Sequence, residues 1–278
     1  LVNNTTASNN TALGFCSLQA NTTGTINTAV GKESLRDNTT GDRNVAIGAE
    51  TLVNNTTGLC NIAIGQGALF TNSTSCNNVA IGKSGLFYNT TGDFNTAIGS
   101  CTLVNNTTAD DNTAVGYISL QDNTTGKRNV ALGRAALANN TTADNNQAIG
   151  YNALVTNTTG CQNTAIGTSA LQANTTGNCN IALGISSLYA NTEGDNNIAI
   201  GCGSLINNTT ANSNTAVGFR TMQANTTGAT NTALGYNALN NNTTATDNTA
   251  IGAYALDANT TGASNTAVGD EALGANTT

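Results

Sequence analysis

The stretch NTTGDRNVAIG, residues 38–48, decides the fold because its pattern recurs every 17 residues, as in NTTGLCNIAIG at residues 55–65. With the repeat glycine counted as position 0, the consensus is G-x-x-(small)-L-x-x-N-T-T-G-x-x-N-(T/V/I)-A-(I/V/L). A period of fixed length without insertions predicts that each copy makes the same turn of a stacked structure. The sixteen repeat glycines are Gly14, Gly31, Gly48, Gly65, Gly82, Gly99, Gly116, Gly133, Gly150, Gly167, Gly184, Gly201, Gly218, Gly235, Gly252 and Gly269.

The repeat predicts an all-β fold. A period of 17 is too short for a two-helix repeat, which needs about 33 residues, and the density of Gly, Asn and Thr opposes helix. Residues 44–48 are typical of a short strand bounded by turn residues, and residues 50–52 predict a second, shorter extended segment. We therefore expect a parallel β-solenoid (β-roll or β-helix) with one coil per repeat, about 16 coils and about 4.8 Å between coils.

The variable positions predict the outside of the coil. All charged residues except Glu193 fall at positions +1, +2, +5, +6, +11 or +12, which predicts a solvated rim. Leu at +4 (Met222 in one coil), Ala at +15 and Ile, Val or Leu at +16 keep their character in every coil and are predicted to form the inside. Because +15 and +16 are consecutive on a strand, they face opposite ways. Either one of them packs on a second surface, as in an oligomer, or Ala is simply small enough for a tight coil.

The asparagine at position +13 predicts a structural role. Asn27, Asn44 and Asn61 belong to this column, and the residue two positions further on is always Ala, so the column never forms an N-x-(S/T) sequon. We expect these side chains to bond local backbone in a turn or to form an asparagine ladder between coils.

The asparagine at position +7 predicts covalent glycans, because it begins an N-x-T sequon in every copy except the one where Glu193 follows Asn191. An N-glycan acceptor needs that hydroxyl residue and an exposed site on an exported protein. Two alternatives remain open: Asn and Thr form packing ladders between coils, or the +8 threonines form an ice-binding face. The glycosylation candidates are Asn4, Asn21, Asn38, Asn55, Asn72, Asn89, Asn106, Asn123, Asn140, Asn157, Asn174, Asn208, Asn225, Asn242, Asn259 and Asn276.

The seven cysteines predict two disulfides. Cys60 and Cys76 occupy positions +12 and +11 of consecutive coils, and Cys161 and Cys179 occupy +11 and +12 of consecutive coils. Stacking would bring each pair within bridging range, which indicates an oxidising, extracellular setting. The other three, Cys16, Cys101 and Cys202, have no partner in a neighbouring coil.

Composition excludes several function classes. Charged residues make up 8% of the 278, the net charge is −7, and histidine is absent. We therefore expect no enzyme, no catalytic residue, no metal, no cofactor apart from covalent glycans, and no nucleic-acid partner. No apolar run reaches the roughly 18 residues of a membrane span. We expect residues 1–278 to form a single uninterrupted array, a window from a longer fibrous protein without its caps.

The segments NVAIG at 44–48 and 78–82, and the matching segment at 129–133, resemble the head repeats of trimeric autotransporter adhesins. The chain also resembles the NTAxGxxAL repeats of bacterial and phage fibre proteins. The resemblance covers every repeat, although the adhesin heads have shorter repeats and lack the NTT segment. It implies a left-handed parallel β-roll, a threefold fibre and an extracellular adhesive or structural role.

Together these observations predict a structural extracellular filament or surface fibre, glycosylated on the NTT ladder and self-associating as a trimer or an end-to-end polymer. The alternative is a rigid stalk or head of an adhesin or a phage-type tail fibre. A lesser alternative is an ice-binding solenoid.

Overall fold

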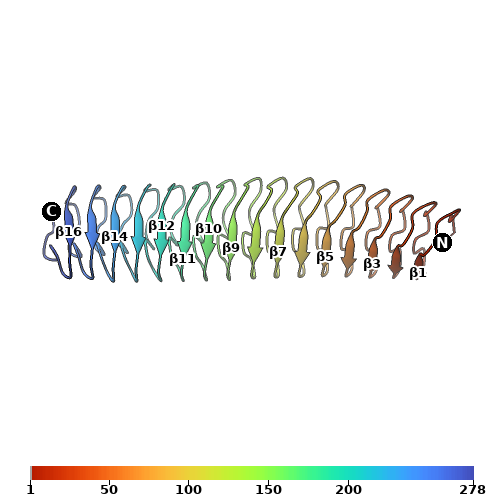
Figure 1. The fold of residues 1–278 in the computed structure, drawn as a ribbon, viewed down its shortest axis with the longest axis horizontal. Coiled ribbons are helices and arrows are strands. Elements are labelled where there is room, and N and C mark those ends of the chain that lie inside the picture. The colour runs from red at the N-terminus through yellow and green to blue at the C-terminus, as the bar shows by residue number, and fades with distance from the viewer. Residues whose placement is uncertain (1) are drawn as a thin grey trace. The chain divides into compact units, whose positions relative to one another are not determined.

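The computed structural model describes residues 2–278, which form three-residue parallel strands joined by turns, with no helix among them. The predicted all-β parallel solenoid is therefore confirmed (Figure 1). The strands are β1 (Thr11–Leu13), β2 (Thr28–Val30), β3 (Val45–Ile47), β4 (Ile62–Ile64), β5 (Val79–Ile81), β6 (Thr96–Ile98), β7 (Thr113–Val115), β8 (Val130–Leu132), β9 (Gln147–Ile149), β10 (Thr164–Ile166), β11 (Ile181–Leu183), β12 (Ile198–Ile200), β13 (Thr215–Val217), β14 (Thr232–Leu234), β15 (Thr249–Ile251) and β16 (Thr266–Val268).

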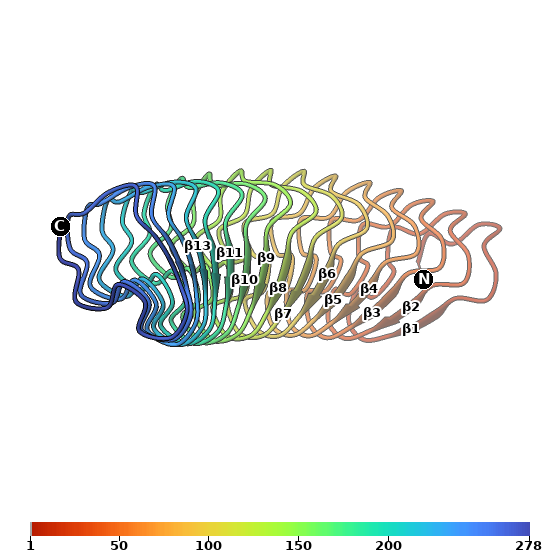
Figure 2. The same ribbon diagram turned by 60° about the vertical axis from the view of Figure 1, so that its left-hand side comes forward.

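The chain divides into two compact units, residues 1–142 with β1–β8 and residues 143–278 with β9–β16. The sequence repeat continues through this boundary. Within each unit the strands lie side by side on one wall of the coils (Figure 2). The pairing is in exact repeat register, so that Ala46 of β3 pairs with Ala63 of β4 and Ala165 of β10 pairs with Ala182 of β11. Each position of the repeat therefore forms a column along its unit.

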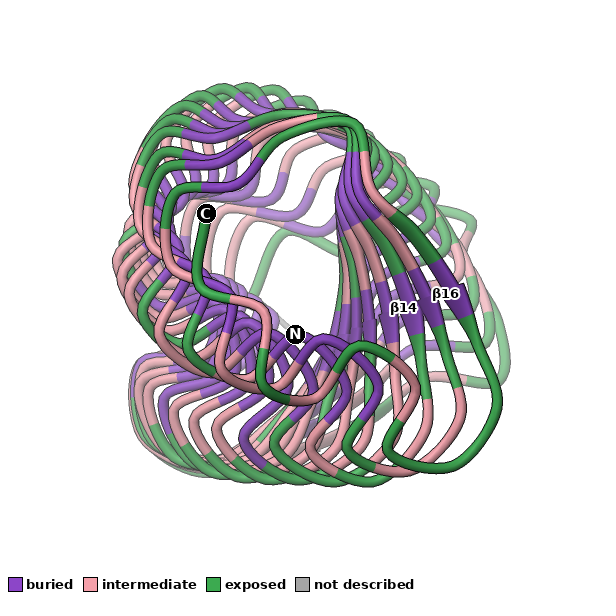
Figure 3. Ribbon diagram, turned by 90° about the vertical axis from the view of Figure 1, so that its left-hand side faces the viewer, coloured by how far each residue is buried: buried purple, intermediate pink, exposed green. Residues whose placement is uncertain are grey.

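The middle residue of each strand points into the coil and the two flanking residues point out. Ala46 is fully buried, whereas Ile47 is 39% exposed, and the same alternation is visible at β14 and β16 in Figure 3. The prediction that Ala at +15 lies inside is confirmed. The prediction that the aliphatic residue at +16 also lies inside is wrong, because alternation on a strand sends it to the opposite face.

Leucine at +4 fills the rest of the interior, and Leu52 is fully buried. The predicted extended segment at residues 50–52 is wrong, since Glu50 and Leu52 have φ angles of 57° and 48°. These left-handed residues belong to consecutive turns, one of which closes with the Asn55 N–H donating to the Leu52 carbonyl at 3.3 Å. A chain that reverses its φ sign at alternate residues curls around the leucine instead of pairing as a strand.

The repeat glycine is required by both conformation and space. Gly48 has φ +135°, and a Cβ placed on it would lie 2.9 Å from the carbonyl carbon of Gly65 in the next coil. Residues with a side chain rarely adopt such a φ, and the close contact leaves no room for a Cβ. The same restriction recurs along this column, for example at Gly99 and Gly116, where a Cβ would lie 2.7 Å and 2.6 Å from the carbonyl oxygen of the next repeat glycine.

Candidate functional site: asparagine ladders and coil surface

The asparagines at position +7 form a buried hydrogen-bonded ladder along each unit. The Nδ2 of Asn55 donates to Oδ1 of Asn38 in the preceding coil at 2.8 Å and to the Gly58 carbonyl of its own coil at 3.1 Å. Its own Oδ1 accepts from Nδ2 of Asn72 at 2.9 Å. Asn55 is fully buried, so both amide hydrogens and the amide oxygen are used inside the protein.

The asparagines at position +13 form a second ladder, which confirms the structural role predicted for them. Oδ1 of Asn27 accepts the backbone N–H of Asn44 at 2.9 Å, and Nδ2 of Asn44 donates to the Gly58 carbonyl in the next coil at 2.8 Å. Asn44 is fully buried. Across the described residues every buried side-chain nitrogen and oxygen has a hydrogen-bond partner, as a stable polar interior requires.

The threonines at position +8 bond the backbone of the next coil. Thr39 Oγ1 donates to the Thr56 carbonyl at 3.0 Å, and Thr90 Oγ1 donates to the Thr107 carbonyl at the same distance. These hydroxyls serve coil stacking and are half-buried, which counts against the +8 column as an ice-binding face. The residues at +9, such as Thr108, are the exposed members of the NTT segment.

The structure counts against N-glycans on the predicted +7 column. A glycan is attached to the asparagine Nδ2, and that atom is buried in fourteen of the sixteen candidates, from Asn21 to Asn259. In Asn174, for example, Nδ2 donates to Asn157 at 2.8 Å and to the Gly177 carbonyl at 3.0 Å. Attachment would remove one donor and would need space that the neighbouring amide occupies. The two remaining candidates, Asn4 and Asn276, are exposed and half-buried.

Position +11 carries a third set of contacts that the sequence analysis missed. The side chain here accepts the backbone N–H of the +11 residue in the preceding coil: Asp42 accepts from Thr25 at 2.6 Å, and Asp195 accepts from Asn178 at 2.6 Å. The recurrence of Asp and Asn in this column was the available signal, because both residues readily accept backbone N–H bonds. The aspartates therefore have a stacking role besides their charge.

The four candidate disulfide cysteines are free thiols in the structure, as are the other three. Cys76 and Cys161 lie at +11 and take the acceptor position, with Sγ accepting the backbone N–H of Leu59 at 3.3 Å and of Asp144 at 3.4 Å. Cys161 thus points toward the coil before it, whereas Cys179 lies in the coil after it. Cys179 Sγ donates to Gln162 Oε1 at 3.3 Å, and the predicted Cys161–Cys179 bridge is not formed. The predicted Cys60–Cys76 bridge is not formed either.

The charged rim contains a few local ion pairs. Lys127 Nζ lies 2.8 Å from Asp110 Oδ2, and the backbone N–H of Asp93 donates to the other Asp110 oxygen at 3.0 Å. Partial burial alone would raise the pKa of Asp110, but the hydrogen bonds from Lys127 and Asp93 outweigh it and lower that pKa below its ordinary value. The Lys127–Asp110 pair therefore joins two neighbouring coils.

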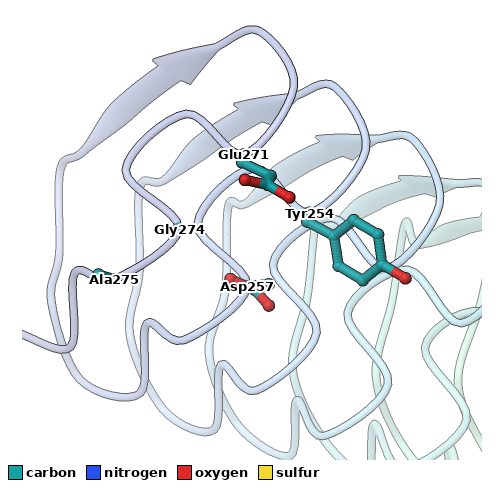
Figure 4. A pocket seen from close by; sticks show the side chains of 5 residues that line it. All are labelled: Tyr254, Asp257, Glu271, Gly274 and Ala275. Atoms are coloured by element: carbon teal, nitrogen blue, oxygen red, sulfur yellow. The ribbon is translucent and has the colours of Figure 1, made fainter.

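One hollow of about 410 Å³ lies beside the last described coil and is lined by Tyr254, Asp257, Glu271, Gly274 and Ala275 (Figure 4). A hydrogen bond with Tyr236 raises the pKa of Tyr254 above its ordinary value. Among residues 2–278 no three His, Cys, Asp or Glu side chains gather in a way that would hold a metal ion.

Comparisons with protein-family models and with curated proteins find no match for this chain. Within the described part of the chain, no helix is long and apolar enough to cross a membrane.

Proposed function

We propose that this chain is a structural segment of an extracellular filament or surface fibre, in which the stacked coils provide a rigid scaffold. The observation that carries the proposal is the pair of asparagine ladders. They link each coil to the next inside both units with buried amide hydrogen bonds, as between Asn38 and Asn55 at 2.8 Å and between Asn163 and Asn180 at 3.0 Å.

The ladders favour a mechanical role over a catalytic one. Each coil is held by backbone bonds, by side-chain amides and by threonine hydroxyls, and contacts of this kind resist local opening because neighbouring amides must separate together. In-register amide ladders are also what stabilises stacked β-structures in fibrils. The residues that recur at +7, +8 and +13 hold neighbouring coils together, and the variable residues lie on the rim.

The glycan part of the prediction needs a different location from the one first expected. The exposed hydroxyls of the NTT segment are those at +9, such as Thr91 and Thr108, while the +7 amides are buried. Within the NTT segment of the coils whose +7 asparagine is buried, a covalent sugar would therefore be O-linked at +9. The filament role does not depend on such a modification.

Labelling at the surface of cells tests the proposal. An antibody raised against residues 1–278 should label filaments on intact, unpermeabilised cells of the native source when viewed by electron microscopy. Label that requires permeabilised cells would contradict an extracellular filament. Label spread along the whole filament supports a structural segment, whereas label confined to a section below an unlabelled tip would favour the stalk of an adhesin or of a phage-type tail fibre.

A further inference from the structure

We propose that the outward strand face is a lateral docking surface for a second copy of this chain. This face consists of the side chains at positions +14 and +16 of each strand, for example Thr96 and Ile98 on β6. The inference rests on the filament function proposed above and names the partner that such a filament would use for its sideways contacts.

The face is uncharged along its whole length in both units. Position +16 is Ile, Val or Leu in all sixteen strands, and position +14 is threonine in nine strands, valine or isoleucine in six, and Gln147 in one. The columns that flank it along the chain, +12 and +1, do carry exposed charges, such as Arg128 and Arg134. An apolar centre with a charged border is the usual anatomy of a protein–protein interface.

The aliphatic side chains of this face are partly exposed, although the alanines and leucines inside the same coils are buried. Ile98 is 38% exposed and Ile200 is 37% exposed, while the Ala residues beside them on the same strands are fully buried. Strands in all-parallel sheets normally have both faces covered. In the described coils the inner face packs on leucine, whereas isoleucines of the outer face such as Ile98 and Ile200 keep more than a third of their surface exposed.

The available area matches what a stable pair needs. A third-exposed aliphatic side chain and its smaller +14 neighbour offer roughly 100 Å² per coil. The eight strands of one unit therefore offer about 800 Å², which is the area that each partner contributes to a standard interface. One unit alone supplies enough surface for specific pairing.

Two copies fit this face. Both outward columns of a strand lie on the same side of the sheet, because positions +14 and +16 are two residues apart on a strand. Two sheets packed face to face, about 10 Å apart, cover both columns of each partner.

The test compares charge placed on the face with the same charge placed off it. The face variant is the full chain carrying Ile98→Lys and Ile200→Lys, one change in each unit. The matched control carries Thr91→Lys and Thr210→Lys on the exposed +9 column. Sedimentation equilibrium under reducing conditions gives the mass of each, and circular dichroism checks that each is folded. A milder variant, Ile98→Thr with Ile200→Thr, uses a residue that the face already contains.

We expect the wild type and the control to sediment as two copies, the lysine face variant as one, and the threonine variant with at least tenfold weaker association. A monomeric wild type, or a face variant that pairs as tightly as the control, would overturn the proposal. A mass of three copies would also overturn it, and a monomeric wild type that depresses the freezing point would assign the face to ice. None of these results would decide the filament function, which the surface-labelling experiment tests independently.

Discussion

Asn44 and Asn55 donate to the same acceptor, the carbonyl oxygen of Gly58, at 2.8 Å and 3.1 Å. Asn44 reaches it from the preceding coil, and Asn55 reaches it from the same coil as Gly58. The two asparagine columns of the repeat therefore meet at one backbone atom per coil. This convergence explains why both columns persist through every repeat: loss of either amide leaves that buried carbonyl with a single partner and breaks a ladder as well.

A break in the +7 ladder should be costly. In Asn106→Ala, the buried Nδ2 of Asn123 loses one of its two acceptors and the amide oxygen of Asn89 loses its donor, since both atoms bond Asn106 at 2.9 Å in the wild type. Each buried polar group left without a partner costs about 1–3 kcal/mol, so we expect a loss of roughly 3 kcal/mol or more. Hydrogen exchange should show faster exchange in the coils on either side of residue 106.

The matched control is Thr108→Ala, two residues along on the exposed +9 column. Its exchange should match the wild type within about 0.5 kcal/mol. Equal protection in the two variants would mean that the amide ladder contributes little to stacking.

The repeat glycine should tolerate no side chain. Gly48→Ala places a Cβ against the Gly65 backbone at a φ of +135°, and we expect a loss of about 3 kcal/mol or more. Gly85→Ala is the control, because a Cβ there would lie no closer than 3.6 Å to any neighbour and Ala68 and Ala136 occupy the same +3 column naturally. Thermal melting followed by circular dichroism should show a large drop in Tm for the first variant and a small one for the second. A similar drop in both would refute the steric account.

The sequence predicted the stacking but not the direction of each side chain. Period, strand type and the +13 ladder followed from residues such as Asn44 and Ala46, because in-register stacking places equal residues together. The +16 column was misplaced because an unvarying aliphatic residue is typical of a core, and the pattern does not say which face of a strand is inside. Glycosylation of the +7 asparagine was predicted for a similar reason, since the sequence N-T-T does not say whether the asparagine side chain points inward or outward.

Acid should weaken the coils around Asp110. Its pKa is lowered in the folded protein by Lys127 and the Asp93 N–H, against the opposing effect of burial. A carboxylate with a depressed folded-state pKa stabilises the protein above its unfolded pKa, near 3.9, and that contribution is lost as pH falls through the folded value. Because the pair is partly exposed, we expect an effect below about 1 kcal/mol.

Asp110→Asn isolates this contribution. Asparagine keeps an oxygen for the Asp93 N–H, as Asn178 does for Cys161 at 2.9 Å, but it does not titrate. Between about pH 4 and pH 2, where an ordinary aspartate becomes protonated, Tm should fall less in this variant than in the wild type. Asp111→Asn removes a neighbouring carboxylate from the exposed +12 column and serves as the control. An unchanged acid dependence in Asp110→Asn would show that the ion pair does not stabilise the coil.

Peptide mass spectrometry of protein from the native source decides the chemistry of the NTT segment. Asn174 has a sequon and a buried Nδ2 that makes two hydrogen bonds, whereas Asn191 lies in the same column without a sequon because Glu193 replaces the threonine. We expect both asparagines to be unmodified, since a glycan at Nδ2 is incompatible with the ladder. Sugar on Asn174 and none on Asn191 would show that this coil does not keep the ladder geometry in the cell. Thr176 and Glu193 occupy the +9 position of these two coils. Sugar on Thr176 and none in the Asn191 coil would place the modification on the exposed +9 hydroxyls instead.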